Sequence, residues 1–482
     1  MRWFGNDTQA VQDAINHVAN SGNGRVVVNE EVLPYDASSV TFDPSVQVAL
    51  PGTNDNVYNV RAYGASLSGG TDGASWAAAV DGLSGGDILY HPGGDGTSIV
   101  ANGYPPLILP AGVTVRGQVN EFSRVRLGAN QDSNLFESES WGSPDSIDGG
   151  IRIEHMDLRG NYSKNTTGTG LALQTAGAKL VDCQISDFAD HGVHLRAGRN
   201  AKPNGNKLFG CRVARCEGYG LWVDGVFDTI ISDFVGGNCQ DAQVRVDTGI
   251  TQFDTIHLFA GRVNGSDSTP GRGLELRSPE VHLNDIVIEK TQREAIRIIA
   301  EDDVIRVVQI NGCHIENCCQ ETNNTFNAIH LEPKGNDDTI SGITLKGATV
   351  DSPEETNIPR FVVGGSGDGA AERLILSDSH LVDFSGRPVD NRILDPSQIE
   401  QSNLFIEEKS TKQKVTGTIP DGNKSASISH DVWGVPRTAI PIPVSEATAL
   451  AVTGRHAGSV EVTRNGNTGD LDLEVIVESF PL

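Results

Sequence analysis

Between about residue 150 and residue 383, apolar and polar positions alternate in a short phrase that recurs along the chain. Each copy starts with Gly or Ala and then alternates apolar residues with residues of varied character, as residues 192–196 do. The phrase recurs over six intervals that span 158 residues, so its mean period is about 26 residues. The copies begin at Gly170, Gly192, Gly220, Gly273, Ala295 and Ala328, with a looser copy at residues 242–247 that is one residue out of step.

A second alternating phrase accompanies the first, with copies that begin at Cys183, Cys211, Ile286, Cys313 and Ser379. Two short alternating segments per period, joined by Gly, Asn and Asp, are typical of half-buried strands separated by turns. Repeats of this length stack, so that each unit buries its apolar face against its neighbours. No helix-length apolar pattern separates the phrases. The sequence therefore predicts an all-β solenoid in which each strand pairs in parallel with its counterpart one coil further on.

The segments that flank the repeat have other patterns. A helical phrase opens at Asp7 and closes at Gly22, and a strand follows at residues 25–28. A second short helix is expected from Thr71-Asp72 to Val80, followed by a strand within residues 85–92. Beyond a polar linker at residues 407–412, strand-like runs recur up to residue 477, with a hairpin turn at residues 465–467. We therefore expect three parts, at residues 1–56, 57–405 and 406–482.

Charge narrows the classes of partner. The net charge of −26 excludes a nucleic-acid surface as the default, because binding phosphate needs a basic face. Only 11 of the 37 basic residues are Lys, and none precedes Lys164. An acidic surface poor in Lys keeps a protein hydrated in strong salt, so the composition indicates a halophilic source. The alternative is an ordinary acidic protein of a mesophile.

The chain shows neither a basic and apolar leader in residues 1–28 nor an apolar run of membrane-spanning length. We therefore expect synthesis in the cytoplasm and no membrane insertion. The seven Cys residues fit neither a disulfide framework nor zinc spacing. Cys183, Cys211 and Cys313 hold equivalent coil positions, which predicts an inward stack in the core. No metal site and no cofactor are expected.

Residues 60–92 carry a family resemblance. The strand that ends in Ala62-Tyr63-Gly64-Ala65, the helix begun by Thr71-Asp72 and the run from Gly85-Gly86 to Pro92 resemble the opening segment of the pectin lyase-like superfamily. The resemblance covers about residues 57–383 and implies a right-handed parallel β-helix whose open end is covered by a capping helix. This superfamily includes lyases, hydrolases, epimerases and virus tail proteins, so the resemblance leaves the activity open.

Within that superfamily, the extra segment before the cap and the β module after the coils resemble viral tailspikes or tail fibres. Residues 430–436 resemble a phrase, H-x-L-G-x-x-P, of small β-sandwich modules that end many virus tail proteins, although the spacing and the Leu differ. The resemblance implies a virion tail protein that acts outside the cell, bound to other tail proteins and to a host surface glycan or glycoprotein. It also implies a homotrimer, and the composition suggests a virus of a halophilic archaeon.

The repeat places candidate binding residues in one column. Neighbouring parallel strands lie ~4.8 Å apart, so side chains of successive coils can reach one polymer sugar. A long polar face with an exposed Trp suits a glycan, whose rings stack on indole while its hydroxyls meet charged groups. The alternative is a solvated strand face with ion pairs between strands, such as Glu275 with Arg297. The candidate glycan-binding residues are His194, Trp222, Arg245, Glu275, Arg297 and His330.

A polysaccharide-degrading enzyme of the same fold is the rival hypothesis. Hydrolysis needs a pair of carboxylates, and the candidates on adjacent coils are Asp187, Asp190, Glu217 and Asp224. Asp190-His191-Gly192 stands where the polygalacturonase branch has "GHG", but the Asp-Asp pair of that branch is missing, so no catalytic role is carried over. A lyase would need an acidic calcium site, and the acidic residues 301–303 suit a solvated turn better. A purely structural spacer is the third possibility.

Overall fold

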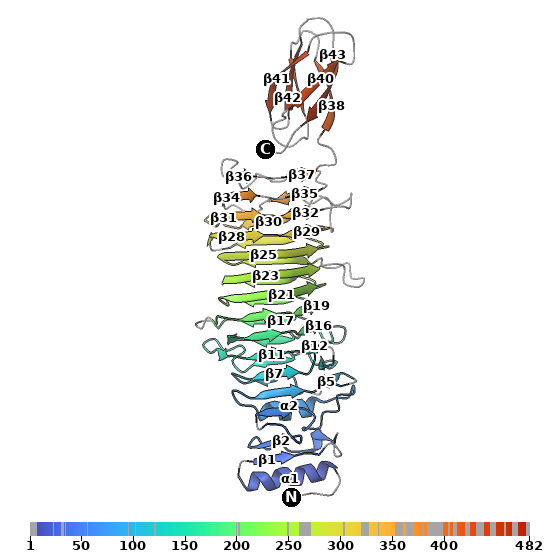
Figure 1. Ribbon diagram of the computed structural model, residues 1–482, viewed down its shortest axis with the longest axis vertical. Helices are drawn as coiled ribbons and strands as arrows, with labels where there is room; N and C mark the ends of the chain where they lie inside the picture. Colours follow the sequence, from blue (N-terminus) through green and yellow to red (C-terminus); the bar gives the residue numbers. More distant parts are fainter. Residues whose placement is uncertain are drawn as a thin grey trace.

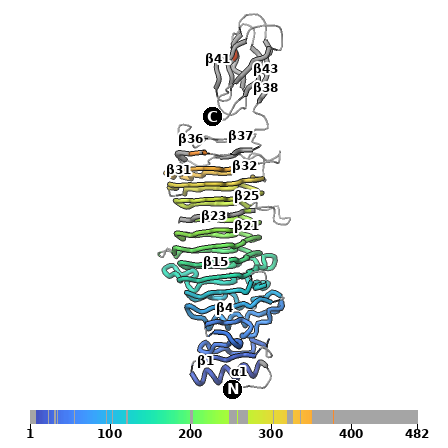
Figure 2. The backbone as a smooth tube through the Cα atoms, in the orientation of Figure 1, coloured from blue at the N-terminus to red at the C-terminus, as the bar shows by residue number. Residues whose placement is uncertain are grey.

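The computed structural model describes residues 7–351, apart from gaps of at most three residues and the stretches 260–270 and 320–326. From residue 352 onward it describes the strands alone. Figure 1 shows an elongated stack of coils with the first helix at one end and the last strands at the other. The chain climbs the stack in sequence order, as the colour gradient of Figure 2 shows.

A ten-stranded sheet holds the first repeated phrase, with one strand from each coil. All of its strand pairs are parallel, and each strand is bonded to its counterpart in the next coil. Its strands are β6 (Leu107–Leu109), β9 (Phe136–Ser138), β13 (Leu171–Leu173), β17 (Val193–Arg196), β20 (Leu221–Asp224), β22 (Ala242–Asp247), β24 (Arg272–Arg277), β26 (Ile296–Ala300), β30 (Asn327–Pro333) and β33 (Arg360–Val362).

A larger sheet of 23 strands covers the rest of the coil wall and is bent into two lines. The first line contains β3 (Val57–Asn59), β4 (Ile88–His91), β7 (Thr114–Gly117), β11 (Arg152–Glu154), β15 (Lys179–Val181), β18 (Lys207–Phe209), β27 (Val304–Ile305), β28 (Val307–Asn311), β31 (Thr339–Lys346), β34 (Ala370–Ser377) and β36 (Ile399–Ser402). The second contains β5 (Ser98–Val100), β8 (Arg124–Leu127), β12 (Asp157–Arg159), β16 (Gln184–Ser186), β19 (Arg212–Ala214), β29 (His314–Glu316), β32 (Thr349–Asp351), β35 (His380–Val382) and β37 (Phe405–Glu407). Three long strands, β21 (Thr229–Gly237), β23 (Ile250–Phe259) and β25 (Glu280–Glu289), run through both lines.

The bend between the two lines depends on one residue per coil whose backbone is in the left-handed conformation. Asp182, Asp233 and Asp285 have φ of 50°, 51° and 49° there, and Gly210 has φ of 61°. Gly adopts this region freely, and Asp is one of the few other residues that tolerate it. The residue after the bend points inward, which buries Cys183, Cys211 and Cys313 in the core. All seven Cys residues are buried and unpaired, so the prediction of an inward stack is confirmed.

The N-terminal end of the stack is closed by helix α1 (Asp7–Asn20), which buries Val11 and Ile15. It packs on a two-stranded parallel sheet of β1 (Gly24–Val27) and β2 (Val46–Ala49). A short helix η2 (Ala37–Ser39) follows, and helix α2 (Gly73–Asp81) buries Trp76 beside β5 and β6. Asp72 stands at the N-cap of α2 but makes no capping bond with its side chain, which instead accepts hydrogen bonds from Ser66 and Ser98.

The C-terminal strands form two three-stranded antiparallel sheets, β38-β43-β40 and β39-β42-β41. Residues 430–437 and 465–470, which include the resembling phrase and the expected hairpin turn, lie outside the described residues. A minor two-stranded sheet pairs β10 (Asp148–Gly149) with β14 (Thr175–Ala176) beside the coils. The strands of the two C-terminal sheets are β38 (Lys412–Ile419), β39 (Ser425–Ser429), β40 (Thr438–Pro443), β41 (Leu450–His456), β42 (Ser459–Arg464) and β43 (Leu471–Glu478).

The predicted fold class is therefore confirmed: a parallel β-helix with an N-terminal capping helix and a C-terminal β-sandwich. The three domain boundaries and the trimerising role of the last module stay predictions. Inside the coils, alternate strand residues point to the axis, as Leu171, Leu173, Val193 and Leu195 do with no measurable exposure. Burying each such side chain stabilises the fold by ~1.5–3 kcal/mol.

Close stacking of the coils leaves no room for a side chain at Gly160. A Cβ added there would lie 2.1 Å from the backbone oxygen of Asp187 in the next coil. We expect Gly160→Ala to destabilise the protein by about 1–3 kcal/mol through overpacking against backbone, measured as a fall in the thermal unfolding temperature. Gly149→Ala is the control, because a Cβ there meets nothing within 4 Å. Equal unfolding temperatures of the two variants would contradict the observed spacing.

Candidate functional site

The outward positions of the ten-stranded sheet form the predicted column. His194 is in register with Trp222, Trp222 with Arg245, and Arg245 with Glu275. Glu275 pairs in turn with Arg297, and Arg297 with His330. The looser copy at residues 242–247 enters this register with Val244 opposite Leu221. All six candidate glycan-binding residues therefore lie on one face, as the sequence predicts.

An aromatic cluster occupies the part of this face nearer the N-terminus. We define the aromatic cluster as Trp141, His191, His194, Tyr219 and Trp222. His194 stacks on Trp222 with ring centroids 4.1 Å apart, and His191 stacks on Tyr219 at 5.2 Å. Trp141 meets the edge of His194 at 5.0 Å. Five rings from three separate segments thus meet beside the neighbouring strands β17 and β20, which carry His194 and Trp222.

Two arginines border the aromatic cluster. The Arg245 guanidinium carbon lies 4.9 Å from the centroid of Tyr219 and 5.3 Å from that of Trp222, within cation–π range. Arg245 also donates a hydrogen bond to the Tyr219 hydroxyl oxygen. The exposed Arg196 lies 5.6 Å from the Trp141 ring. The cluster therefore combines ring faces with fixed positive charge.

The expectation of an exposed Trp222 is wrong. Trp222 is half-buried, with His194 from the preceding coil stacked against it and Arg245 from the following coil on its other side. Its indole N–H donates to Asp247 Oδ2 at 2.8 Å. The reason is the coil spacing: an indole in a strand column lies between its neighbours, which cover both faces. Trp222 supports the cluster rather than offering a free ring face.

His191 links the aromatic cluster to a carboxylate. Its Nδ1 accepts a hydrogen bond from the Tyr219 backbone N–H at 3.0 Å, and its Nε2 lies 3.1 Å from Asp190 Oδ1. Burial, with the nearby His194 and Arg245, lowers the pKa of His191 to about 3. The ring is therefore neutral near pH 7, and because Nδ1 accepts, its proton is on Nε2 and faces Asp190.

Two carboxyl groups flank a residue that has no side chain. Gly218 N donates to Asp190 O at 2.8 Å, and Asp241 N donates to Gly218 O at 3.4 Å, so the three residues follow one another on successive coils. Burial raises the pKa of Asp190, and the charge of Asp241 adds to this effect. Burial likewise raises the pKa of Asp241. A Cβ at Gly218 would lie 2.6 Å from His191 Nδ1, so only Gly fits there.

Two other predicted carboxylates, Glu217 and Asp224, lie in different surroundings. Glu217 lies beside the pair, accepts a hydrogen bond from Gln240, and has a pKa raised by burial. Asp224 lies on the face itself, 3.6 Å from His194 Nε2.

The candidate role of Asp187 as a catalytic acid or base is not supported by its contacts. Arg215 binds it through two hydrogen bonds of 2.6 and 2.8 Å, and Ser186 donates a third of 2.8 Å. Although burial opposes the charge, these bonds lower the pKa of Asp187. The residue directly follows β16, in the large sheet, rather than preceding a strand of the ten-stranded sheet as Asp190 does. Asp187 is thus held in an ion pair with Arg215.

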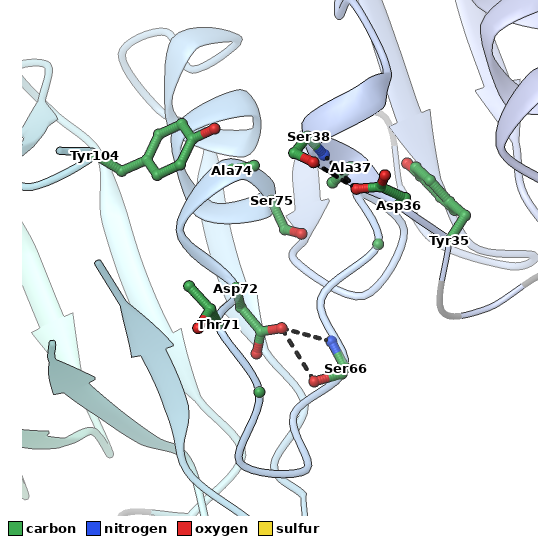
Figure 3. Close-up of a pocket in the computed structure, with 12 residues that line it drawn as sticks. Tyr35, Asp36, Ala37, Ser38, Ser66, Thr71, Asp72, Ala74, Ser75 and Tyr104 are labelled. Carbon is green, nitrogen blue, oxygen red and sulfur yellow. Dashed lines mark hydrogen bonds between the residues drawn. The ribbon is translucent and has the colours of Figure 1, made fainter. Parts of the chain in front are cut away.

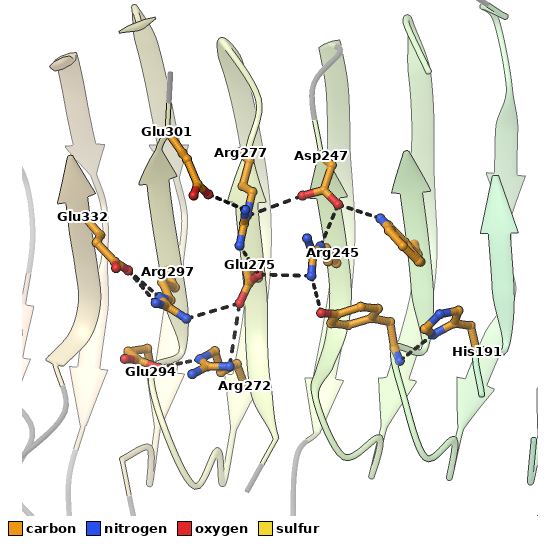
Figure 4. A network of polar contacts seen from close by, with 12 residues as sticks. His191, Arg245, Asp247, Arg272, Glu275, Arg277, Glu294, Arg297, Glu301 and Glu332 are labelled. Carbon is orange, nitrogen blue, oxygen red and sulfur yellow. Dashed lines mark hydrogen bonds and ion pairs between the residues drawn. The ribbon is translucent and has the colours of Figure 1, made fainter. Parts of the chain in front are cut away.

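An arginine–carboxylate ladder occupies the remainder of the face, as Figure 4 shows. Its centre is Glu275, which is 4% exposed and lies 3.4–3.6 Å from Arg245, Arg272, Arg277 and Arg297. Every Arg of the ladder also contacts at least one of four outer carboxylates. The ladder consists of Arg245, Asp247, Arg272, Glu275, Arg277, Glu294, Arg297, Glu301 and Glu332.

Glu275 and Arg297 form the ion pair that the alternative interpretation expects. Arg297 reaches Glu332 at 2.5 Å as well as Glu275, and although burial opposes the charge, Glu332 raises the pKa of Arg297. His330 is half-buried, with its pKa lowered by burial, and contacts Asn327. These groups already have their polar partners within the protein.

A separate cavity of about 420 Å³ lies near the N-terminal cap, as Figure 3 shows. It is bounded by η2 and the segment before it, by the start of α2 and by Tyr104. Its two carboxylates are engaged, because Asp72 bonds Ser66 and Asp36 bonds Ser38 and Ser39. Because both carboxylates already have partners within the protein, the cavity is a weaker candidate.

Sequence reasoning missed three members of the site. Trp141 belongs to a loop after β9, outside the repeated phrases, so no periodicity could place it. Tyr219 and Asp241 lie in turns that precede strands, and the intervals between successive copies of the turn differ. The equivalence of Tyr219 to His191 becomes visible when the copies are aligned on Gly192 and Gly220. Asp241 precedes the shifted copy, which has no Gly, so only the strand register places it after Gly218.

Within the described residues, no group of three or more His, Cys, Asp or Glu side chains is placed to hold a metal ion. In the same part of the chain, no helix is long and apolar enough to cross a membrane.

Solved structures with a similar fold include phage tailspikes and an epimerase module. Tailspike protein 2 of Escherichia coli O157:H7 bacteriophage CAB120 is 12% identical over 91% of this chain and 66% of its own, with a TM-score of 0.51. The A-module of an Azotobacter vinelandii mannuronan C-5 epimerase is 12% identical over 73% and 100% of the two chains, with a TM-score of 0.44. A tailspike of Acinetobacter baumannii bacteriophage Fri1, described as a capsular polysaccharide depolymerase, is 11% identical over 91% and 90%, with a TM-score of 0.41.

No family model matches the sequence, and no curated relative is similar to it. The tailspike with the score of 0.51 shares the parallel β-helix fold, and this chain spans just under two thirds of that tailspike's length. The other two scores are too low to carry further meaning.

The ladder predicts a large cost for removing its central charge. Glu275→Gln leaves four guanidinium groups without their shared buried carboxylate, so we expect a loss of about 3–5 kcal/mol, measured by thermal unfolding. Glu301→Gln is the matched control, because Glu301 is 42% exposed in its pair with Arg277 and such pairs contribute about 0–1 kcal/mol. Similar unfolding temperatures for the two variants would show that the ladder does not stabilise the coils.

Proposed function

We propose that this chain is a virion tail protein of the tailspike type that binds a glycan on the surface of its host cell. The observation that carries the proposal is the aromatic cluster: five rings, two bordering arginines and adjacent carboxyl groups gathered on one face of a parallel β-helix. Sugar rings stack on aromatic faces, and their hydroxyls bond charged groups. The fold shared with a phage tailspike supports the same class by analogy.

The proposed contact surface lies toward Trp141, Arg196 and Asp224. Arg196 and Asp224 stand opposite each other on β17 and β20, and Trp141 adjoins them from its loop. His194 contacts Trp141 and stacks on Trp222, so these two rings support the surface. The ladder beyond β24 contributes rigidity, because its charges are already satisfied.

Three further features belong to the proposal. A tailspike role implies a virion location, a homotrimer and contacts with other tail proteins, with the C-terminal sheets as the module that trimerises. The acidic, Lys-poor composition supports a halophilic source, with a virus of a halophilic archaeon as the proposed origin. Light scattering in molar salt tests the trimer, and a monomer at that salt would exclude it.

Removing Trp141 tests the contact surface. We expect Trp141→Ala to weaken binding by at least about fivefold, because stacking on one aromatic ring is worth ~1–3 kcal/mol in comparable ring systems. Binding is measured on an array of bacterial and archaeal surface polysaccharides. Phe122→Ala is the control, since Phe122 is 58% exposed and is not part of the aromatic cluster. Unchanged binding of the Trp141 variant would place the glycan elsewhere.

A glycan depolymerase is the second candidate function, favoured by the Asp190 and Asp241 pair. Their backbones are separated by two coil spacings, or ~9.6 Å at ~4.8 Å each, and the charge of Asp241 acts on the Asp190 carboxyl across Gly218. Inverting hydrolysis needs its carboxyl groups ~6.5–9.5 Å apart, with one protonated as the acid. The raised pKa of Asp190 keeps that carboxyl protonated at higher pH than an ordinary Asp, and His191 Nε2 is in contact with it.

Two Asp variants separate the catalytic candidate from its structural neighbour. If the chain cleaves a polysaccharide, Asp190→Asn should lower turnover by at least about a hundredfold, because general acid or base catalysis contributes ~10²–10⁴. Asp187→Asn should retain turnover while lowering the unfolding temperature, because its carboxylate binds Arg215. Release of reducing ends reports hydrolysis, and absorbance of an unsaturated sugar reports elimination. Full turnover by the Asp190 variant would remove that residue from the mechanism.

A further inference from the structure

A second surface, on the large sheet, carries an opposite charge from the rest of the chain. We define the basic face as the outward positions of β7, β8, β11, β12, β15, β16, β18 and β19. Of its 16 outward positions, eight are basic and two are acidic, so the face has a net charge of +6 in a chain of −26. Its basic residues are Arg116, Arg124, Arg126, Arg152, Arg159, Lys179, Lys207 and Arg212.

Several of the basic residues are stacked directly on one another. Arg152 is in register with Lys179, and Lys179 with Lys207, on three successive coils. In the second line of the sheet, Arg126 is in register with Arg159. Like charges opposite each other on neighbouring strands destabilise a sheet. The arrangement therefore has a cost for folding, in contrast to the ladder on the ten-stranded sheet, where Arg and Glu alternate.

Part of the face is held in place by two buried carboxylates. Glu154 contacts both Arg116 and Arg152, and its side chain is 5% exposed. Asp157, at 2% exposure, contacts both Arg124 and Arg159. Each carboxylate thus fixes two guanidinium groups that are themselves 31–43% exposed. Each of these groups of three keeps a net positive charge.

The other four basic residues have no carboxylate partner among the described residues. Arg126, Lys179 and Arg212 are exposed, and Lys207 is half-buried on the same surface. Together with the two fixed groups, they make a positive surface over four coils, which extends over three coil spacings or ~14 Å. A fixed array of guanidinium and ammonium groups is suited to bind carboxylates that recur along a chain.

We propose that the basic face binds an acidic polysaccharide, one that carries a carboxylate on successive sugars. It is distinct from the aromatic cluster, because it lies on the other sheet, and it does not depend on the function proposed for that cluster. Duplex nucleic acid fits less well: it is stiff over ~150 base pairs and would extend from this face across the acidic remainder of the chain. A flexible polysaccharide needs only a few sugars on the face.

A charge-reversing pair of substitutions tests the proposal. The probe is alginate, a polyuronate, with neutral dextran as its uncharged counterpart, and binding is measured by calorimetry. Salt is raised from the lowest concentration at which circular dichroism shows folded protein. We expect alginate but not dextran to bind, more weakly as salt rises, and Lys179→Glu/Lys207→Glu to weaken binding at least about tenfold with a shallower salt dependence.

Arg306→Glu/Lys346→Glu is the matched control, because it changes the net charge equally at exposed positions on later coils of the same sheet. It should alter alginate binding less than about twofold. The proposal is overturned if alginate does not bind at the lowest salt, if both double variants weaken binding alike, or if duplex DNA binds as tightly as alginate. A change in oligomeric state in the Lys179 and Lys207 variant alone, seen by light scattering, would assign the face to a subunit contact instead.

Discussion

Every surface of the coils depends on the backbone hydrogen bonds between parallel strands, which hold each coil directly over the one before it. These backbone hydrogen bonds run through both sheets, from β3 to β37 in one and from β6 to β33 in the other. They make residues some two dozen positions apart into neighbours ~4.8 Å away. The short spacing explains why Gly is required where coils approach most closely, as at Gly160 and Gly218. It also turns each outward position into a column, so the chemistry of a face is the chemistry of its columns.

Side chains stack within the columns in three different arrangements. Near the N-terminal half of the ten-stranded sheet, flat rings stack, as His194 does on Trp222. Further along, charges of opposite sign alternate, so that Glu275 neutralises arginines on its own strand and on both neighbouring strands. On the basic face of the large sheet, like charges follow each other instead. The first two arrangements stabilise the stack, whereas the third has a cost for folding, which a bound anion would reduce.

Much of the fold was predictable, because periodicity is a property of the whole chain and survives local irregularity. The register from His194 to Trp222, Arg245, Glu275 and Arg297 follows from the copies alone, including the shifted copy at residues 242–247. The inward Cys stack follows from the same alignment. The sequence could not predict which members of a column satisfy one another, because that depends on side-chain length and burial. The column alone does not reveal that Glu275 lies among four arginines.

The site was less predictable than the fold because its chemistry lies partly in turns. Asp187 and Asp190 are only three residues apart, yet one is bound by Arg215 and the other faces His191. Trp141 belongs to a loop that no repeat describes. Turn lengths vary between coils, so period arguments locate strands far better than the residues between them.

The ten-stranded sheet is divided between the aromatic cluster and the ladder. This division also affects where a bound sugar would gain the most binding free energy. A sugar placed over the ladder would displace water from ion pairs that already have their hydrogen-bond partners, and it could offer them little in return. Over the aromatic cluster, a sugar ring would cover apolar ring surface while Arg196 and Asp224 receive its hydroxyls. The balance of desolvation against new contacts therefore favours the region from β9 to β22. The ladder beyond it acts as a rigid continuation of the same stack, which keeps the rings of the cluster in register.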